Sequence, residues 1–182
     1  MLTVSQRREF EKNNELNIAL DLGEYGRFRV NVFRQRQNPA LVIRLIKNKI
    51  LNFGKLSLPP LLADLSLEQR GLVLITGKAG SGKSTTAAAM IDHRNINREG
   101  HIICVEDPIE FYHEHKKSII TQREIGSDTE SFSTAVKNAL RQRPDVIFIG
   151  ETRERAVMDA ALTAAETGHL CCLLYTSPSP RD

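Results

Sequence analysis

Cysteine is scarce in this sequence of 182 residues, which contains only three. Cys171 and Cys172 are adjacent, and Cys104 lies far from both. This spacing matches no metal-binding pattern, and an odd number of cysteines gives no disulfide framework. The sequence therefore favours a protein that stays reduced, and we expect a cytoplasmic location.

Long apolar runs and a strong net charge are lacking as well. No stretch approaches the roughly 20 apolar residues of a membrane span, and the first eight residues lack the apolar centre of a secretory signal. With 25 Lys and Arg against 22 Asp and Glu, the formal net charge is +3. That charge is too weak and too dispersed to favour a nucleic-acid partner. We therefore expect no transmembrane segment and no nucleic acid.

Residues 77–84 read G-x-x-x-x-G-K-S, the pattern of a phosphate-binding P-loop. The apolar run at residues 72–75 predicts a buried strand before it, and residues 84–95 predict a helix after it, which is the context that the motif requires. Its glycines let backbone N–H groups face an anion, and the helix dipole adds to the attraction. Lys83 is expected to reach the β- and γ-phosphates, and Ser84 to bind Mg²⁺. The sequence thus predicts a site for ATP and Mg²⁺ formed by Gly77, Lys78, Ala79, Gly80, Ser81, Gly82, Lys83, Ser84 and Thr85.

The chain from residue 71 onward alternates strands and helices, which is typical of a parallel α/β sheet. Strands are predicted at 72–76, 101–105 and 146–149, with helices at about 84–95, 129–141 and 153–166. A capping box formed by Ser127, Asp128, Thr129 and Glu130 is expected before the second of these helices. Gly168 is expected to close the third.

The first part of the chain has a different pattern. Residues 5–14 predict a polar helix, and residues 16–22, 27–34 and 40–47 predict strands, with a hairpin turn at 23–26. Two consecutive prolines and a leucine-rich segment up to Gln69 predict a linker and a short helix. The expected domains are therefore 1–55 and 71–171, joined by a linker at 56–70.

Carboxylates follow two of the predicted strands. Glu106, Asp107 and Glu110 come after one strand, and Glu151 comes after another. Because the carboxyl ends of parallel strands meet at one edge, we expect these side chains near the γ-phosphate, although a carboxylate after a strand is otherwise a helix cap or a solvated loop residue. The second strand has the Walker B pattern, but Gly150 stands where an aspartate is usual. Glu151 is thus the expected general base and, through water, a ligand of Mg²⁺; Lys83 and Glu110 are the other predicted catalytic residues.

Four segments in this order resemble the Walker A, Asp, Walker B and His boxes of the type IV pilus retraction ATPases, the PilT/PilU family of the type II/IV secretion ATPase superfamily. They are residues 77–84, 105–111, 149–153 and 165–170. Residues 26–35 also resemble the end of that family's PAS-like N-terminal domain. Within the family, residues 113–117 and 121–126 favour the PilU side.

This resemblance implies a P-loop RecA-like parallel sheet with flanking helices, preceded by the remnant of an α+β PAS-like domain. It also implies a hexameric ring of identical subunits, or one mixed with a paralogous retraction ATPase. ATP would bind between one subunit's RecA-like domain and its neighbour's N-terminal domain. Hydrolysis would drive pilus retraction and twitching motility at an inner-membrane platform protein, with the motor peripheral to that membrane in the cytoplasm.

The resemblance also implies roles for single residues. Glu151 matches the catalytic glutamate, while Glu106, Asp107 and Glu110 fall in the Asp box. His169 matches the first histidine of the His box, although a lone histidine is equally typical of a structural position. Arg27 and Arg29 match a basic strand presented toward bound nucleotide, where a cation from a neighbouring subunit stabilises transition-state charge; a solvated strand face is the alternative.

The two ends of the chain depart from the family pattern. The sequence begins inside the N-terminal domain, and the resemblance stops at residue 170 or 171. Residues 172–182 resemble a translated transposase-type sequencing adapter. We therefore expect a gene fragment with an artefactual tail, rather than a natural Ser/Pro-rich tail, and weak or absent ATP hydrolysis by the fragment alone.

Three other functions remain to be weighed against a retraction motor. One is an accessory subunit that binds ATP with little turnover of its own. Another is an assembly or secretion ATPase of the same superfamily, but those usually carry a four-cysteine zinc site, and residues 84–151 contain only Cys104. A nucleotide kinase would need a second substrate pocket and a lid, for which the sequence offers no segment.

Overall fold

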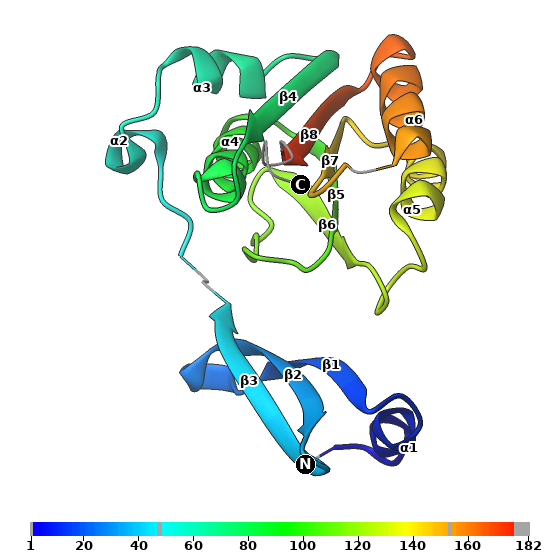
Figure 1. Cartoon of the computed structure of the whole chain (residues 1–182). Helices are drawn as coiled ribbons and strands as arrows, with labels where there is room; N and C mark the ends of the chain where they lie inside the picture. The colour runs from blue at the N-terminus through cyan, green and yellow to red at the C-terminus, as the bar shows by residue number, and fades with distance from the viewer. Residues whose placement is uncertain (1, 47–48, 153, 177–182) are drawn as a thin grey trace. The chain divides into compact units, whose positions relative to one another are not determined.

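A computed structural model gives the fold of the chain and describes residues 2–46, 49–152 and 154–176 (Figure 1). Residues 177–182, the end of the expected adapter tail, lie outside the described residues. The chain forms two compact units, Met1–Asn48 and Lys49–Asp182. The sequence placed the end of the first domain at residue 55.

The first unit is a helix followed by a three-stranded antiparallel sheet. Helix α1 spans Val4–Asn13, and strands β1 (Glu15–Asp21), β2 (Arg27–Gln35) and β3 (Asn38–Ile46) follow in the spatial order β1-β2-β3. A 3-10 turn, Gly23–Tyr25, joins β1 and β2 where a hairpin turn was predicted. Alternate residues of β2 point to opposite faces, so Val30 and Val32 pack against Phe10 of α1. The predicted helix and three strands are therefore present.

The second unit contains a five-stranded sheet in which every neighbouring pair is parallel. Its spatial order is β4-β8-β7-β5-β6. Two short helices, α2 (Phe53–Leu56) and α3 (Leu61–Ser66), precede it, and α3 is the predicted leucine-rich helix. The strands are β4 (Gly71–Gly77), β5 (Gly100–Glu106), β6 (Ser118–Glu124), β7 (Val146–Ile149) and β8 (Leu170–Thr176). The predicted α/β fold with a parallel sheet is confirmed.

Helices cover both faces of this sheet. Helix α4 (Lys83–Asn97) packs on one face through Ala87 and Ile91, against a cluster that includes Ile102 and Cys104 of β5. Helices α5 (Phe132–Ala139) and α6 (Arg155–Glu166) lie side by side on the other face, against the cluster of Ile103. Strands β5 and β7 are buried on both faces and are continuously apolar, which is why the sequence identified them. Strand β4 is also apolar, although Leu72 and Leu74 on one of its faces are exposed.

Two of the five strands were missed. Strand β6 lies at the edge of the sheet and ends in four polar residues, Thr121 to Glu124, so its sequence has no continuous apolar run. Strand β8 lies between β4 and β7 and includes residues 172–176, which the sequence assigned to the adapter tail. The assignment of the tail as an artefact stays a prediction.

The predicted capping box before α5 was wrong. Helix α5 begins at Phe132, and the Ser131 hydroxyl accepts the N–H of Thr134 at 3.2 Å. Asp128 instead accepts the Glu124 N–H at 2.8 Å, so it stabilises the turn after β6. The end of α6 is as predicted, because Gly168 follows it with a φ of 106°.

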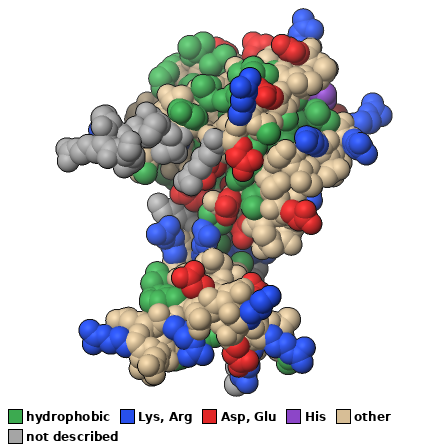
Figure 2. Space-filling view, turned by 45° about the vertical axis from the view of Figure 1, so that its right-hand side comes forward, with side chains coloured by type: hydrophobic (Ala, Val, Ile, Leu, Met, Phe, Trp, Pro, Cys, Tyr) green, Lys and Arg blue, Asp and Glu red, His purple; other side chains and the backbone are tan. Residues whose placement is uncertain are grey.

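The surface of the chain mixes charges of both signs. Figure 2 shows Lys and Arg side chains interspersed with Asp and Glu on the visible face. None of the helices in the described parts of the chain has the length and apolar character that a bilayer crossing requires.

Two buried polar residues fix the end of helix α4. The Asn95 side chain is fully buried; its Nδ2 donates to the Glu114 carbonyl at 2.7 Å, and its Oδ1 accepts the N–H groups of Lys116 (3.1 Å) and Ser118 (3.3 Å). Arg94, next to it, donates to the carbonyls of residues 66 and 68 at 3.0 and 2.6 Å. Helix α4 therefore holds both the end of α3 and the loop before β6.

Replacing Asn95 by leucine is expected to lower the free energy of unfolding by about 2–4 kcal/mol, because buried backbone groups would lose their partner. Urea denaturation of the chain measures this change. Asn97→Leu is the matched control, since the exposed Asn97 side chain bonds the carbonyl of His93 in its own helix. Equal losses in the two variants would contradict the role of Asn95.

Candidate functional site

The predicted phosphate loop, residues 77–84, joins the end of β4 to the start of α4. Gly82 is the N-cap of α4 with a φ of 91°, a left-handed conformation that favours glycine. At Gly77 an added Cβ would lie 2.7 Å from the Ser81 hydroxyl, so the loop has no room for a side chain there. The first N–H groups of α4 have no partner within the helix and, together with its dipole, form an anion site.

The Lys83 side chain folds back over this loop. Its Nζ donates to the carbonyl oxygens of Gly77 and Lys78, each at 2.9 Å. The ammonium group therefore lies beside the curve of the loop, where it would meet a bound phosphate. Ser84, the second residue of the helix, offers a hydroxyl oxygen of the kind that Mg²⁺ binds. These groups fit a magnesium-bound polyphosphate.

Two of the predicted carboxylates lie at the same edge of the sheet as the phosphate loop. Glu106 is the last residue of β5, and Glu151 follows β7 by two residues. Strands β5 and β7 are parallel neighbours, with Val105 opposite Ile149, so Glu106 leaves the sheet beside Gly150, the residue before Glu151. Strand β8 separates the end of β7 from β4 and the loop, and both β7 and β8 separate β5 from them.

Gly150 occupies the position where a Walker B aspartate is usual, and the structure gives the physical reason. Its N–H donates to the Val105 carbonyl at 2.8 Å, which holds β7 close to β5. A Cβ at Gly150 would lie 3.2 Å from Cγ and 3.3 Å from Cα of Glu106. The glutamate of the neighbouring strand thus fills the space that a side chain at position 150 would need.

Glu106 is a buried carboxyl group with two hydrogen-bond donors. Its exposed fraction is 8%. Oε1 accepts from Nε2 of Gln122 at 3.0 Å, and Oε2 accepts from the Glu110 N–H at 3.4 Å. Burial raises the pKa of Glu106 to about 7, against the opposing effect of these hydrogen bonds. The group can therefore gain or lose a proton near neutral pH.

A cavity of about 250 Å³ beside the end of β7 is lined by two of the predicted carboxylates. Asp107 and Glu151 line it, together with Glu130 and Glu154, which the sequence analysis missed. Both missed residues stand just before helices α5 and α6, and that position was their only sequence signal. Glu110 is exposed and belongs to the same β5–β6 loop, residues 107–117.

His169 lies at the other end of the strands, directly before the first residue of β8. Strand β8 pairs with β4 from Leu170 opposite Gly71 to Thr176 opposite Gly77, so His169 is about 20 Å from the phosphate loop, a full strand length. Its Nδ1 is 3.0 Å from the carbonyl of Ala164, at the end of α6. Within this chain the structure does not bring His169 to the predicted nucleotide site.

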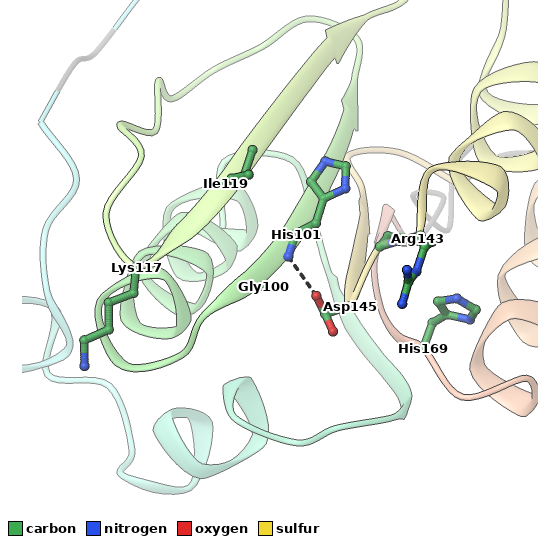
Figure 3. Close-up of a pocket in the computed structure, with 8 residues that line it drawn as sticks. Gly100, His101, Lys117, Ile119, Arg143, Asp145 and His169 are labelled. Carbon is green, nitrogen blue, oxygen red and sulfur yellow. Dashed lines mark hydrogen bonds between the residues drawn. The ribbon is translucent and has the colours of Figure 1, made fainter.

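A larger hollow, of about 580 Å³, lies at that end of the strands (Figure 3). Asp145 accepts the His101 N–H at 2.7 Å, and the His101 ring is 3.1 Å from the Gln142 carbonyl and 2.9 Å from the Thr121 hydroxyl. In Figure 3 the Lys117 side chain extends away from this pair. Asp145 and His101 thus already bond other groups of the protein. The end of the sheet that carries the phosphate loop is therefore the stronger candidate for a ligand site.

Arg27 and Arg29 lie on the face of β2 opposite the one that packs against Phe10. Register places Arg29 directly across from Arg44 of β3, so a third arginine shares this face. The sequence analysis missed Arg44, because only the strand register shows that it shares a face with Arg29.

Replacing Gly150 by alanine is expected to lower the free energy of unfolding by about 1–3 kcal/mol, because the added Cβ meets backbone atoms of β5. Thermal or urea denaturation of the chain measures this loss. Gly54→Ala in α2 is the control, since its Cβ would lie 3.7 Å from its nearest neighbour, Asn52 Oδ1, which is an ordinary contact. An alanine at position 150 that is as well tolerated as one at position 54 would show that the space is open.

Glu106→Gln is expected to stabilise the chain above neutral pH. Because the pKa of Glu106 rises from 4.5 to about 7 on folding, the folded chain keeps a proton in that interval that the unfolded chain has released. Stability is therefore lost as pH rises from 4.5 through 7, by about 3 kcal/mol in total. The variant avoids this loss, so its advantage should grow between pH 5 and pH 8 in urea denaturation.

Glu110→Gln removes an exposed carboxylate from the same loop and is the control for this measurement. A Glu106→Gln variant whose stability follows the wild type at both pH values would contradict the raised pKa.

Comparison with known proteins agrees with this geometry. Residues 3–176 match the family of type II/IV secretion system proteins. The chain is 52% identical over 171 residues to the type IV pilus ATPase PilU of Pseudomonas aeruginosa, covering 94% of this chain and 45% of that protein. It is 47% identical over 165 residues to the retraction ATPase PilT of the same organism, covering 91% and 48%. The crystal structure of the pilus retraction motor PilT with bound ADP matches with a TM-score of 0.94 at 45% identity, covering 97% of this chain and 51% of that one.

The chain thus spans about half the length of the curated relatives it matches. The matched range includes β8 and therefore residues 172–176. The fold of the chain, with its parallel sheet, agrees with that of the matching PilT structure. The chain belongs to the type II/IV secretion system protein family, and within that family it is similar to the pilus ATPases PilU and PilT.

Proposed function

We propose that this chain is the nucleotide-binding part of an ATPase subunit that drives type IV pilus retraction. The observation that carries the proposal is the arrangement of the phosphate loop, Glu106 and Glu151 at one edge of the parallel sheet. The matching PilT structure contains ADP, and the relatives are named as pilus ATPases, which supports ATP as the ligand.

Residues 77–85 bind the phosphates of ATP in this proposal. Backbone N–H groups of the loop and of the first turn of α4 face the phosphate oxygens. Lys83 exchanges its two backbone carbonyls for the β- and γ-phosphates and neutralises their charge. Mg²⁺, held by the Ser84 hydroxyl and through water by Glu151, would offset the negative charge that develops on the transferred phosphate.

Glu151 is the proposed general base, which orients the attacking water and takes its proton. Asp107 lines the same cavity and adds negative charge that favours a bound cation and ordered water. Glu110 donates its N–H to Glu106 and so fixes the start of the β5–β6 loop. The Glu106 side chain packs beside Gly150 at the end of β7 and accepts hydrogen bonds from Glu110 and Gln122, which keeps the ends of β5 and β7 in place.

The arginines of β2 and β3 are proposed to act on the nucleotide of a neighbouring subunit. Arg29 and Arg44 are directly opposed, and like charges in that position repel. An anionic phosphate from another subunit, with Arg27 beside it, would relieve this repulsion. His169 is assigned a structural part at the end of α6, because it bonds there and lies a strand length from the phosphate loop.

Arginines supplied by a neighbouring subunit require an assembly of subunits, and we propose that this assembly is a hexameric ring. We propose a ring of identical subunits, or one mixed with a paralogous retraction ATPase, that acts on the inner-membrane pilus platform protein from the cytoplasmic side. The 182 residues alone are proposed to hydrolyse ATP weakly or not at all.

ATPase assays on the product of the complete gene test the proposal. Glu151→Gln is expected to lower kcat about 100-fold or more while ATP binding persists, because it removes the base and keeps the shape. Lys83→Ala should weaken ATP binding itself. Glu99→Gln, an exposed carboxylate just before β5, is the control and should leave turnover unchanged.

Turnover that is equal in the wild type and in Glu151→Gln would contradict the motor function. ATP binding without such turnover would favour the accessory subunit, a function that the similarity to PilU keeps open.

A further inference from the structure

We propose that Gln122 is a positioning residue of the ATPase site, which holds the carboxylate of Glu106 in its working orientation. The inference rests on the function proposed above, because that function gives Glu106 its task. Gln122 lies on β6, an edge strand that the sequence analysis did not identify.

The side-chain amide of Gln122 makes three hydrogen bonds. Nε2 donates to Oε1 of Glu106 at 3.0 Å and to the carbonyl of Phe111 at 2.8 Å. Oε1 accepts the N–H of His113 at 2.9 Å. These partners fix which end of the amide is nitrogen, because a rotated amide would place an NH₂ group against the His113 N–H.

The strand register explains why Gln122 reaches Glu106. Strand β6 runs parallel to β5 with Gln122 opposite Cys104 and Glu124 opposite Glu106, so both β6 side chains lie on the same face as Glu106. Glu124 also bonds the loop, because its Oε2 accepts the Ile109 N–H at 3.0 Å. Two alternate residues of β6 therefore hold the β5–β6 loop at the point where Glu106 ends its strand.

A buried carboxylate needs hydrogen-bond donors, since burial removes it from water. Of the two donors to Glu106, the Gln122 amide is the closer, at 3.0 Å against 3.4 Å for the Glu110 N–H. On its other side the Glu106 side chain lies next to Gly150, the residue directly before Glu151. Gln122 thus holds the Glu106 carboxylate from the β6 side, while Cγ of the same side chain lies beside Gly150, at the end of the strand that leads to the proposed base.

Gln122→Glu is the sharpest variant, because it keeps the shape and the acceptor for the His113 N–H but removes the amide donor to Glu106 and to the Phe111 carbonyl. In the product of the complete gene we expect kcat to fall about 10- to 100-fold, as is typical when an outer partner of a site residue is lost. KM and ADP affinity should stay within about 2-fold, because the phosphate loop is untouched. Thr121→Val, on the same strand, removes the bond to His101 and should leave kcat unchanged.

A double-variant cycle separates positioning from a general structural role. If Gln122 acts through Glu106, then Glu106→Gln combined with Gln122→Glu should have the same kcat as Glu106→Gln alone. Losses that instead add in the double variant would overturn the inference. Loss of ADP binding in Gln122→Glu would also overturn it, because Gln122 would then maintain the fold of the site rather than position one carboxylate.

Two further results tell this inference and the proposed function apart. Turnover that depends on Glu151 but is unaffected by Gln122→Glu would overturn the inference alone. Turnover that Glu151→Gln does not change would overturn the proposed function, and this inference with it.

Discussion

The buried hydrogen bonds of Asn95 and Arg94 are the interaction on which the arrangement of the site depends. Helix α4 begins in the phosphate loop, and these two residues lie in its last turn, about 18 Å along the helix axis from Lys83. Asn95 bonds the backbone on either side of residue 115, and Arg94 bonds the end of α3. Because a helix is stiff along its axis, fixing its far end also fixes the phosphate-binding end relative to the β5–β6 loop.

The same loop is fixed a second time at the edge where the carboxylates gather. Gln122 and Glu124 bond it from β6, and Glu106 closes the space above Gly150 from β5. Helix α4 connects the β5–β6 loop to the phosphate-binding side of the site. The contacts of Gln122, Glu124 and Glu106 connect the same loop to the end of β7, which Glu151 follows. The β5–β6 loop thus connects the phosphate loop after β4 with the end of β7. In the sheet itself, β8 lies between these two strands.

Those parts of the fold that local chemistry determines could be predicted from the sequence. The phosphate loop needs glycines in left-handed or crowded positions, and β5 and β7 are apolar because helices cover both of their faces. The parts that depend on distant partners could not. Edge strand β6 has a polar sequence, Gln122 acquires its task only through the register with β5, and Arg44 joins the arginine face only through the register with β2. The capping box failed for a related reason, because Asp128 bonds the turn after β6 and Ser131 caps the helix instead.

The glycine at position 150 is explained by a side chain of the neighbouring strand β5. A Walker B aspartate at this position would place its Cβ 3.2 Å from Cγ and 3.3 Å from Cα of Glu106, so the two side chains would compete for the same space. The hydrogen bond from the Gly150 N–H to the Val105 carbonyl holds β7 close to β5. The carboxylate at this place therefore comes from β5 rather than from β7, and it is buried there and held by Gln122. At this edge the buried acid is thus Glu106 of β5, and Glu151 is the first carboxylate that follows β7.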